Sequence, residues 1–462
     1  MAMRGMRTVL RAGLLAGTCM AAAPAAAQDA DVEQRLDRLE ALVMQLVERL
    51  DAQKGQMESQ QAEAVAATQQ ALAETKALQA RQAELAAQID EPKKQEDKGF
   101  RVGNTTISYA GYVKFDAISQ RTSGGQVDSG NIVRDFLIPG AIPVGGDGSG
   151  WDTDYNARQS RLIFKTATDV GAEHTLNSQI ELDFMVTPGG DERISNSYEP
   201  RLRQAFITYD NWLFGQAWST FQNVGALPDS LDFIGTTPGT VFVRQPMIRY
   251  TSGGLMLAAE QPETTVTTPA GGRVLGGDDT LPDFVARYNL SGDWGSVTAA
   301  GILRNLRISD DDLGSDGDSA IGYGLSVSGK LALGERDDLR FMGTVGDGLG
   351  RYIGLNIVND AALDLDGDLD PIFTYSGFAA YRHLWSDKLR SSVAGSYFKA
   401  DNPVLLTTGA VTDESWNVFA NIIYSPVRPV DIGLEYMYAK RTLENGTSGN
   451  LQKLQLSAKY SF

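Results

Sequence analysis

Cysteine and histidine, the side chains most often used as nucleophiles, general bases and metal ligands, are scarce in this sequence. Its 462 residues include one cysteine, Cys19, and two histidines, His174 and His383. No Gly-x-Ser-x-Gly sequence, zinc-ligand cluster or phosphate-binding loop accompanies them. The two histidines are far apart in the chain, and each lies close to a short predicted turn. The sequence therefore predicts no enzyme, no metal site and no cofactor.

Long apolar runs and basic charge are also missing. After the N-terminal segment there is no apolar run of about 18 residues, which excludes a protein that crosses a membrane with helices. The formal net charge is −17 at pH 7, and the first 27 residues contribute three positive charges, from Arg4, Arg7 and Arg11. The rest of the chain is therefore still more acidic. We do not expect it to bind nucleic acid, whose phosphates attract basic surfaces.

Residues 1–27 have the features of a secretory signal peptide. Three arginines precede an apolar middle, and small residues stand at Ala25 and Ala27, after which cleavage is expected. Lipid attachment at Cys19 is an alternative, but Thr18 stands where a lipoprotein signal has Gly or Ala. Cleavage after Ala27 leaves a mature chain that has neither thiol nor disulfide chemistry.

The following segment, residues 28–90, is rich in Gln, Ala, Glu and Leu and contains no proline. Its first heptads carry apolar residues at two positions of the repeat, which is typical of a coiled-coil seam. The predicted seam residues are Val32, Leu36, Leu39, Val43, Leu46 and Leu50. This seam has no partner within the segment, so we expect parallel self-association. A single amphipathic helix packed on the next domain is the alternative. Pro92 ends the helix, and residues 91–99 form a charged linker.

From residue 100 onward the apolar period changes from 3.5 to 2. Residues 175–184 and 453–462 alternate polar and apolar side chains over their whole length. Such alternation is typical of strands with one apolar and one polar face. Sixteen strand segments are predicted within residues 100–462. They start near Thr105, Tyr155, Thr175, Arg201, Trp212, Val241, Leu255, Pro282, Gly295, Ser319, Leu339, Ile372, Leu389, Glu414, Val430 and Leu451.

The connections between these segments alternate between short and long. Asp210-Asn211 and Ser252–Gly254 are examples of the short ones. Long ones are expected after Ile118, Val186, Trp218, Gln261, Ile308, Gly346, Ala400 and Arg441. An even strand count with this alternation is typical of outer-membrane barrels, whereas a soluble sandwich has no reason to maintain it. We therefore predict an all-β transmembrane barrel of 16 antiparallel strands, preceded by an N-terminal α-helical coiled coil.

In such a barrel the apolar face of each strand meets lipid, and the polar face lines the lumen. A lumen of 16 strands is too wide for wall side chains alone to fill. The third long connection, about residues 218–240, has no clear period but contains Trp218, Phe221 and Phe233, too many apolar residues for a disordered loop. We expect it to fold into the lumen, with its aromatic residues packed beneath it and with Asp229 and Asp232 pinning it to the wall.

Charged side chains at the narrowest part of a pore determine its selectivity. The strand phase places most candidate cations within the first nine strands, where the in-folded loop would face them. Some of them could instead merely neutralise inward acids such as Glu181 and Asp183. The predicted pore-lining and constriction residues are Lys114, Arg161, Lys165, Arg201, Arg203, Arg249, Arg287, Arg304, Asp229 and Asp232.

Four stretches resemble the DcaP-like porins. They are GYVKFDA (111–117), ARQSRLIFKT (157–166), RLRQAFITYDNWLFGQAWSTF (201–221) and VRQPMIRYT (243–251). The resemblance extends from about residue 111 to residue 462, and the preceding coiled coil is also similar to that family. It implies a trimeric outer-membrane porin of sixteen strands with a periplasmic N-terminal segment. It also implies a preference for small carboxylated organic anions.

Together these features predict a passive outer-membrane channel for small anionic, carboxylated organic solutes, with aromatic and dicarboxylic acids as candidates within that class. The expected partners are two further copies of the chain, outer-membrane lipid and lipopolysaccharide, the solutes, and peptidoglycan through the N-terminal segment. A structural or adhesion protein with a plugged barrel is an alternative, and an outer-membrane lipase is another. The acidic residues 364–370 have spacing like the start of an EF-hand loop but lack its Gly and final Glu, so a solvated loop is expected.

Overall fold

The computed structural model describes residues 99–462 with the exception of 172–173, 187–195, 270, 277–279 and 310–316. The predicted signal peptide, the coiled coil and all but the last residue of the linker lie outside the described residues. Among the described residues, no helix is long and apolar enough to cross a membrane.

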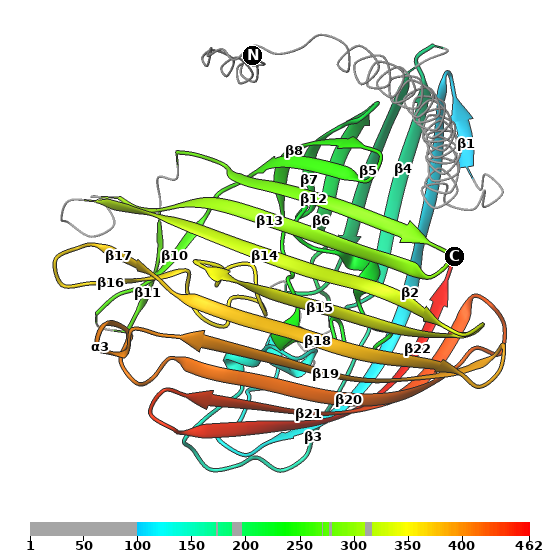
Figure 1. The fold of residues 1–462 in the computed structure, drawn as a ribbon. Coiled ribbons are helices and arrows are strands. Elements are labelled where there is room, and N and C mark those ends of the chain that lie inside the picture. The colour runs from blue at the N-terminus through cyan, green and yellow to red at the C-terminus, as the bar shows by residue number, and fades with distance from the viewer. Residues whose placement is uncertain (1–98, 172–173, 187–195, 270, 277–279, 310–316) are drawn as a thin grey trace, which may run out of the picture. The chain divides into compact units, whose positions relative to one another are not determined.

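The described residues form a closed antiparallel barrel with sixteen wall strands (Figure 1). Its large sheet also includes β1 (Gly99–Val102), which pairs only with β2. Two short strands, β3 and β4, pair with successive parts of β2 and together make one wall strand. The wall consists of β2 (Thr105–Thr122), β3 (Asp152–Asn156) with β4 (Arg161–Asp169), β5 (Thr175–Asp183), β6 (Arg201–Tyr209), β7 (Trp212–Trp218), β8 (Arg244–Ser252), β9 (Leu255–Glu260), β12 (Asp283–Gly292), β13 (Gly295–Ile308), β14 (Asp318–Leu333), β15 (Asp337–Asp347), β18 (Phe373–Leu384), β19 (Leu389–Asp401), β20 (Thr412–Tyr424), β21 (Val430–Leu443) and β22 (Ser448–Ser461).

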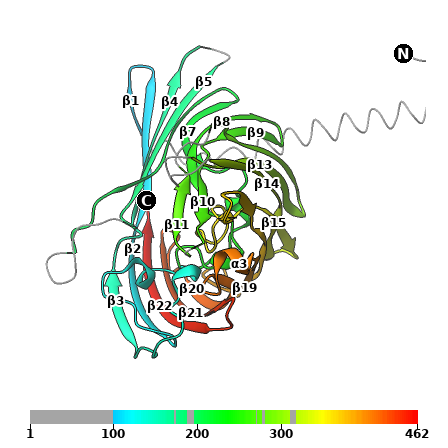
Figure 2. The same cartoon turned by 90° about the vertical axis from the view of Figure 1, so that its left-hand side faces the viewer.

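The first and last wall strands close the ring. Strand β2 pairs with β22 from Tyr112↔Ser461 to Thr122↔Leu451, so the wall has no free edge. In the view of Figure 2 the strands follow one another around this ring from β4 through β13 to β22 and back to β2. The strand count and the closure agree with the prediction.

Alternation along each strand separates the two faces of the wall. In β14, Tyr323, Leu325 and Val327 are exposed, whereas Ser326 and Ser328, which alternate with them, are buried. The exposed apolar side chains form the outer surface of the wall and the buried polar ones face the interior, which is the pattern expected of a barrel in a membrane. The apolar phase therefore points outward, as the sequence predicted.

One connection differs from its prediction. The connection after Arg441, expected to be long, is the tight turn of residues 444–447 between β21 and β22. Gly446 adopts a φ of +80° there, and its backbone N–H donates to the Leu443 carbonyl at 2.9 Å. Asn445-Gly446 is a strong hairpin signal, because these two residues accept positive φ more readily than others.

Five long connections leave the wall at the end of the barrel opposite the short turns, and the third of them folds back into the lumen (Figure 1). The first loop (123–151) contains η1 (Ile132–Arg134) and η2 (Pro139–Ala141), and the third loop (219–243) contains η3 (Val224–Ala226) and η4 (Thr237–Gly239). The fourth loop (261–282) and the sixth loop (348–372) share a small sheet of order β11-β10-β16-β17. Its strands are β10 (Thr264–Thr267), β11 (Arg273–Gly276), β16 (Ala361–Leu363) and β17 (Leu369–Pro371); the seventh loop (402–411) contains α3 (Val404–Thr407).

The loops pack on one another through apolar side chains. Phe136 of the first loop, Met185 and two third-loop residues, Ile234 and Phe242, form one buried cluster. The third and sixth loops also pair as backbone, because the Phe242 N–H donates to the Tyr352 carbonyl at 2.9 Å. These contacts give the third loop a rigid support on the side away from the wall.

Candidate functional site

The third loop is bonded to side chains of the inner wall along most of its length. Its first residues reach β9 and β13: the Thr220 N–H donates to Glu260 at 2.6 Å, and the Asn223 amide donates to Thr298 at 3.0 Å. Further along, the Leu227 carbonyl accepts a hydrogen bond from a wall arginine of β15. The loop therefore lies inside the lumen, fixed to the inner wall, and not on the outer surface of the barrel.

The middle of the loop is bound by the last wall strands and the first. Glu435 of β21 accepts hydrogen bonds from the backbone N–H groups of Leu231, at 2.8 Å, and Asp232, at 3.1 Å. The Leu231 carbonyl accepts from Gln455 of β22 at 2.9 Å and from Lys114 of β2 at 2.6 Å. Polar groups that would otherwise be buried without partners are satisfied in this way.

The two acidic residues of the loop pair with wall cations. Asp229 lies 2.6 Å from Arg390, and Asp232 pairs with Lys453 in a fully buried contact. Asp232 also accepts the Leu137 N–H of the first loop at 3.0 Å. Burial alone would raise the pKa of Asp232, but Lys453 and the backbone N–H donors outweigh it and lower that pKa. The geometry is that of a tethered loop.

Local sequence explains the path of the loop. Asn223 begins η3 by accepting the Gly225 N–H at 3.1 Å, and Asp232 accepts the N–H of Gly235 at 2.9 Å in a tight turn. At Gly239 the backbone touches the wall so closely that a Cβ there would lie 2.0 Å from the Gly377 carbonyl oxygen. A larger residue at Gly239 would push η4 off β18.

The aromatic residues of the third loop pack rather than face open space. Phe221 is 2% exposed and meets the Tyr352 ring edge-on, with 5.9 Å between the ring centres. Phe233 lies 5.2 Å from Phe136 of the first loop, and Trp218 lies 4.8 Å from Phe242. These rings therefore pack against neighbouring loop residues and do not line an open path for solutes.

Three predicted cations share two carboxylates of β5. Arg201 donates to Asp183 at 2.8 Å, and Arg203 donates to Glu181 at 2.5 Å and to Asp183 at 2.7 Å. Arg161 lies 3.3 Å from Glu181. The strand register shifts at Glu181, so that Gln204 also donates to this carboxylate. These arginines face inward, but most of their charge is neutralised.

Lys114 and Arg304 are buried rather than open to the lumen, with exposures of 6% and 2%. Lys114 lies 3.1 Å from Asp116 and holds the third loop, while Arg304 lies 2.6 Å from Asp360 of the sixth loop. Both were expected to line the constriction; instead, loops cover them. Lys165 lies on the inward phase of β4 but is exposed.

The remaining two predicted cations form no ion pair with any residue that the structure describes. Among the described residues, no carboxylate lies within ion-pair distance of Arg249 or Arg287. Arg287 donates to the Gln222 carbonyl of the third loop at 2.6 Å and to Asn289 at 2.8 Å. The Nε atom of Arg249 is buried and has no hydrogen-bond partner within the described chain. Both residues therefore keep their charge available.

The sequence reasoning missed three further cations because it stopped at the ninth strand. Lys330, Arg340 and Arg382 surround a single carboxylate, Asp338, at 3.8, 2.8 and 2.5 Å. Arg340 also donates to the Leu227 carbonyl of the third loop at 2.5 Å. All three lie on the buried phase of β14, β15 and β18, which the alternation of those strands could have revealed.

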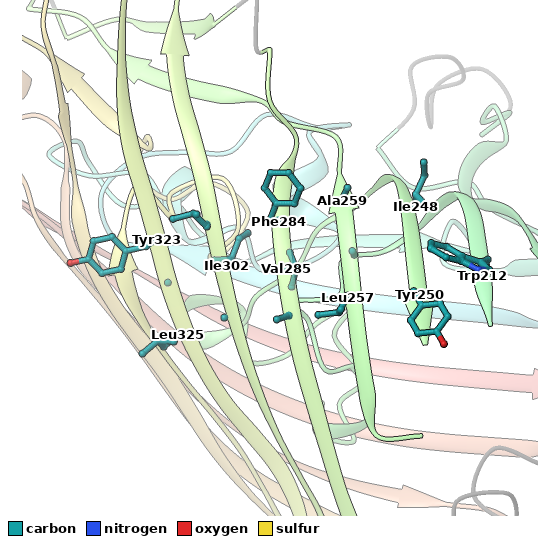
Figure 3. A pocket seen from close by; sticks show the side chains of 15 residues that line it. Trp212, Ile248, Tyr250, Leu257, Ala259, Phe284, Val285, Ile302, Tyr323 and Leu325 are labelled. Atoms are coloured by element: carbon teal, nitrogen blue, oxygen red, sulfur yellow. The ribbon is translucent and has the colours of Figure 1, made fainter. Parts of the chain in front are cut away.

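The large apolar hollow of the molecule lies on the outside of the wall. It has a volume of about 890 Å³ and is lined by residues of β7, β8, β9, β12, β13 and β14, including Leu257, Phe284 and Leu325 (Figure 3). These three side chains are exposed and belong to the outward phase. The hollow is thus part of the outer surface of the wall and not of the lumen.

The two histidines and the acidic residues 364–370, considered above as catalytic or calcium-binding candidates, make local structural contacts. The His174 ring pairs with Asp210 at 2.8 Å and the His383 ring with Asp337 at 2.9 Å, both near short turns. In the acidic sixth loop, the Asp364 carboxylate accepts the N–H of Asp366 at 2.9 Å and so closes its own turn. Within the described part of the chain, no group of three or more His, Cys, Asp or Glu side chains is placed to hold a metal ion.

Comparison with known proteins shows the family to which this barrel belongs. The sequence matches the DcaP outer membrane protein family over residues 57–462, most of the chain. The chain belongs to this family. Its DcaP fold resembles the crystal structure of the outer membrane channel DcaP of Acinetobacter baumannii, with 24% identity and a TM-score of 0.66 over 79% of this chain and 99% of that one.

A more distant likeness exists to an anion-selective porin from Comamonas acidovorans. The identity is 9% and the TM-score 0.50, over 78% of this chain and 100% of that one. At such identities the likeness shows the fold alone. None of the curated proteins matches this DcaP-family chain. The chain is therefore an outer-membrane protein of the DcaP family with a porin barrel, and its solutes must be argued from its own residues.

Proposed function

We propose that this barrel is a passive diffusion channel for small organic anions, in particular carboxylates with an aromatic ring or a second carboxyl group. One observation carries the proposal: among the described residues, five inward cations have a single carboxylate within ion-pair distance, which pairs with three of them and leaves the other two without an ion pair. They are Arg249, Arg287, Lys330, Arg340 and Arg382, and the carboxylate is Asp338. The excess of positive charge lies on one arc of the wall, from β8 to β18.

The third loop brings solutes close to this arc. Arg287 and Arg340 each donate to a carbonyl of the loop, so both cations stand where the loop meets the wall. A narrow passage with low-dielectric walls strengthens the effect of fixed charge on a passing ion. Arginine also matches the planar carboxylate group with two parallel donors. Carboxylated solutes are therefore favoured over cations of similar size.

Reversal potentials of single channels in planar bilayers test the proposal. With a salt gradient across the bilayer, the full mature chain should show a clear preference for chloride over potassium ions. A swelling assay with liposomes should rank dicarboxylates and aromatic acids above sugars and amino acids of similar size. A strong cation preference would overturn the anion proposal. A channel that never opens would favour the alternative, a barrel that only anchors surface loops.

We also propose a homotrimer whose residues 28–90 form a parallel coiled coil in the periplasm, with peptidoglycan as a further partner. The apolar seam of that segment supports self-association. Removal of residues 29–90 should reduce the trimer fraction or cell-wall retention and leave the conductance of each barrel unchanged. A change in conductance would show instead that the segment contributes to the pore.

A further inference from the structure

A second cavity, of about 400 Å³, opens between the loops at the mouth of the barrel. Four loops line it: the first, fourth, sixth and seventh. We propose that it is a capture site for an organic carboxylate with a compact apolar body, occupied before the solute reaches the third loop. The inference rests on the proposed function, since it concerns anions that enter the same channel. It adds a site that contains none of the constriction residues.

Two arginines that are far apart in the sequence, Arg273 and Arg441, line this cavity. Arg273 belongs to β11 of the fourth loop. Its Nε atom donates to the Asn359 side chain at 2.6 Å, and its Nη2 atom donates to the Asn356 carbonyl at 3.1 Å. Both acceptors are neutral, so they orient the guanidinium without cancelling its charge. The Nη1 atom donates no hydrogen bond to any described residue.

Arg441 of β21 is held in the same manner. Its Nε atom donates to the Thr412 hydroxyl at 2.9 Å, and its Nη1 atom donates to the Ile142 carbonyl of the first loop at 3.2 Å. The Nη2 atom is left without a partner among the described residues. Two fixed guanidinium groups, each with a free donor, make a place for one carboxylate or for the two carboxylates of a small diacid.

The acids near this cavity are already engaged. Asp360 lies 2.6 Å from Arg304 and accepts the Arg351 N–H at 2.9 Å. Glu444 accepts a hydrogen bond from the Asn402 side chain at 2.8 Å. Neither carboxylate is within ion-pair distance of Arg273 or Arg441. The cavity therefore has a net positive lining although the chain as a whole is acidic.

The rest of the lining limits the class of ligand. Ile138, Leu355, Ile357 and Val411 give the cavity an apolar side, and a volume of about 400 Å³ suits one small molecule. The Asn402 Oδ1 atom is buried and has no hydrogen-bond partner, so it can accept from a hydroxyl group on the solute. An inorganic oxyanion would use the arginines but would leave the apolar side empty.

Block of single-channel current by benzoate tests the inference. Benzoate is added either to the loop side or to the turn side of the full mature chain in a planar bilayer. In the native protein, the half-blocking concentration should be lower from the loop side. The variant R273Q/R441Q should raise the loop-side value about tenfold, as expected when a charge-assisted hydrogen bond is lost. Its turn-side value should not change.

Two controls make the result specific. The variant R121Q removes one charge from the outward phase at the same end of the barrel and should leave the block unchanged. Inorganic phosphate should block more weakly than benzoate from the loop side; equal block and equal sensitivity to R273Q/R441Q would overturn the choice of an organic carboxylate. Open-channel conductance without benzoate establishes that each variant is folded.

The two proposals fail in different ways. If the native channel prefers anions but R273Q/R441Q leaves the loop-side block as it was, the capture site is excluded and the channel function stands. If the native channel prefers cations, the reversal potential excludes the anion channel directly, and the capture site falls with it.

Discussion

Asp232 and Lys453 form a buried ion pair between the third loop and β22, across 221 residues of sequence. Neither side chain is more than 1% exposed. Removing one member of such a pair leaves a charge without a partner in a site that excludes water, which typically costs about 3–5 kcal/mol. This contact is therefore a strong tether among the several that hold the loop.

The variant K453M should release the third loop from the wall. We expect a large loss of stability, on the order of several kcal/mol, and noisier single-channel current because the loop then samples several positions. The first effect is measured as thermal unfolding, monitored by the difference in mobility between folded and heat-unfolded barrels on SDS gels. The control D229N breaks only the partly exposed contact with Arg390 and should cost about 1 kcal/mol or less. Equal losses in the two variants would contradict the assigned role of Asp232.

The unpaired arginines of the inner wall should dominate ion preference. Replacing Arg249 and Arg287 together by Gln removes two cations that have no carboxylate partner, so the chloride preference should fall severalfold. The matched control R201Q/R203Q removes two cations whose charge is largely neutralised by Asp183 and Glu181. It should lower stability more than the R249Q/R287Q change does, because Asp183 and Glu181 lose their partners at a buried site. A larger selectivity loss in the control would show that the β5–β6 cluster is the true constriction.

Asp338 offers a change in the opposite direction. It is the only carboxylate within ion-pair distance of Lys330, Arg340 and Arg382 among the described residues. The variant D338N should therefore raise the preference for chloride, because the same cations lose their counter-charge. The control D387N removes an acid from an exposed short turn, where screening by salt is strong. Reversal potentials of both variants at equal salt provide the comparison.

The first loop should respond to pH through Asp135. Burial raises the pKa of Asp135 to about 6, even though Arg158 acts against that shift. A folded-state pKa above the unfolded value means that the folded loop binds the proton more tightly. Its extra stability is complete below about pH 4 and is lost as the pH rises through 6, by about 3 kcal/mol in total.

Hydrogen exchange measures this effect. Protection of the amides near η1, corrected for the intrinsic exchange rate, should fall between pH 4 and pH 7 in the native chain. The variant D135N cannot titrate and should show a flat profile over that range. A native profile that is already flat, or that rises with pH, would contradict the assignment to Asp135.

Strand phase and turn length were enough to predict the barrel. Alternation identified the sixteen wall strands and their outward faces, because a two-residue period leaves only two possible orientations for each strand. Arg249 and Arg287 were placed on the inner wall for the same reason. The turn at Asn445-Gly446 was misjudged because the polar residues before it were taken as loop.

The pairing of charges could not be predicted from phase alone. Phase puts Arg203, Arg249 and Arg304 on one face, but only tertiary contacts decide which of them meets a carboxylate. Asp360 reaches Arg304 from the sixth loop, 56 residues away in sequence. No local pattern encodes such a contact, and the same holds for Arg273 and Arg441 at the mouth.

The third loop binds both strands that close the barrel. Lys114 belongs to β2 and Gln455 to β22, and both donate to the same carbonyl, that of Leu231. The first and last strands of a barrel can pair only after every strand between them has been made, and a slip in their register would turn each side chain to the wrong face. A single carbonyl that accepts from both strands favours the correct register at that step. Barrel closure and seating of the third loop are thus coupled, so an unseated loop would delay assembly as well as alter transport.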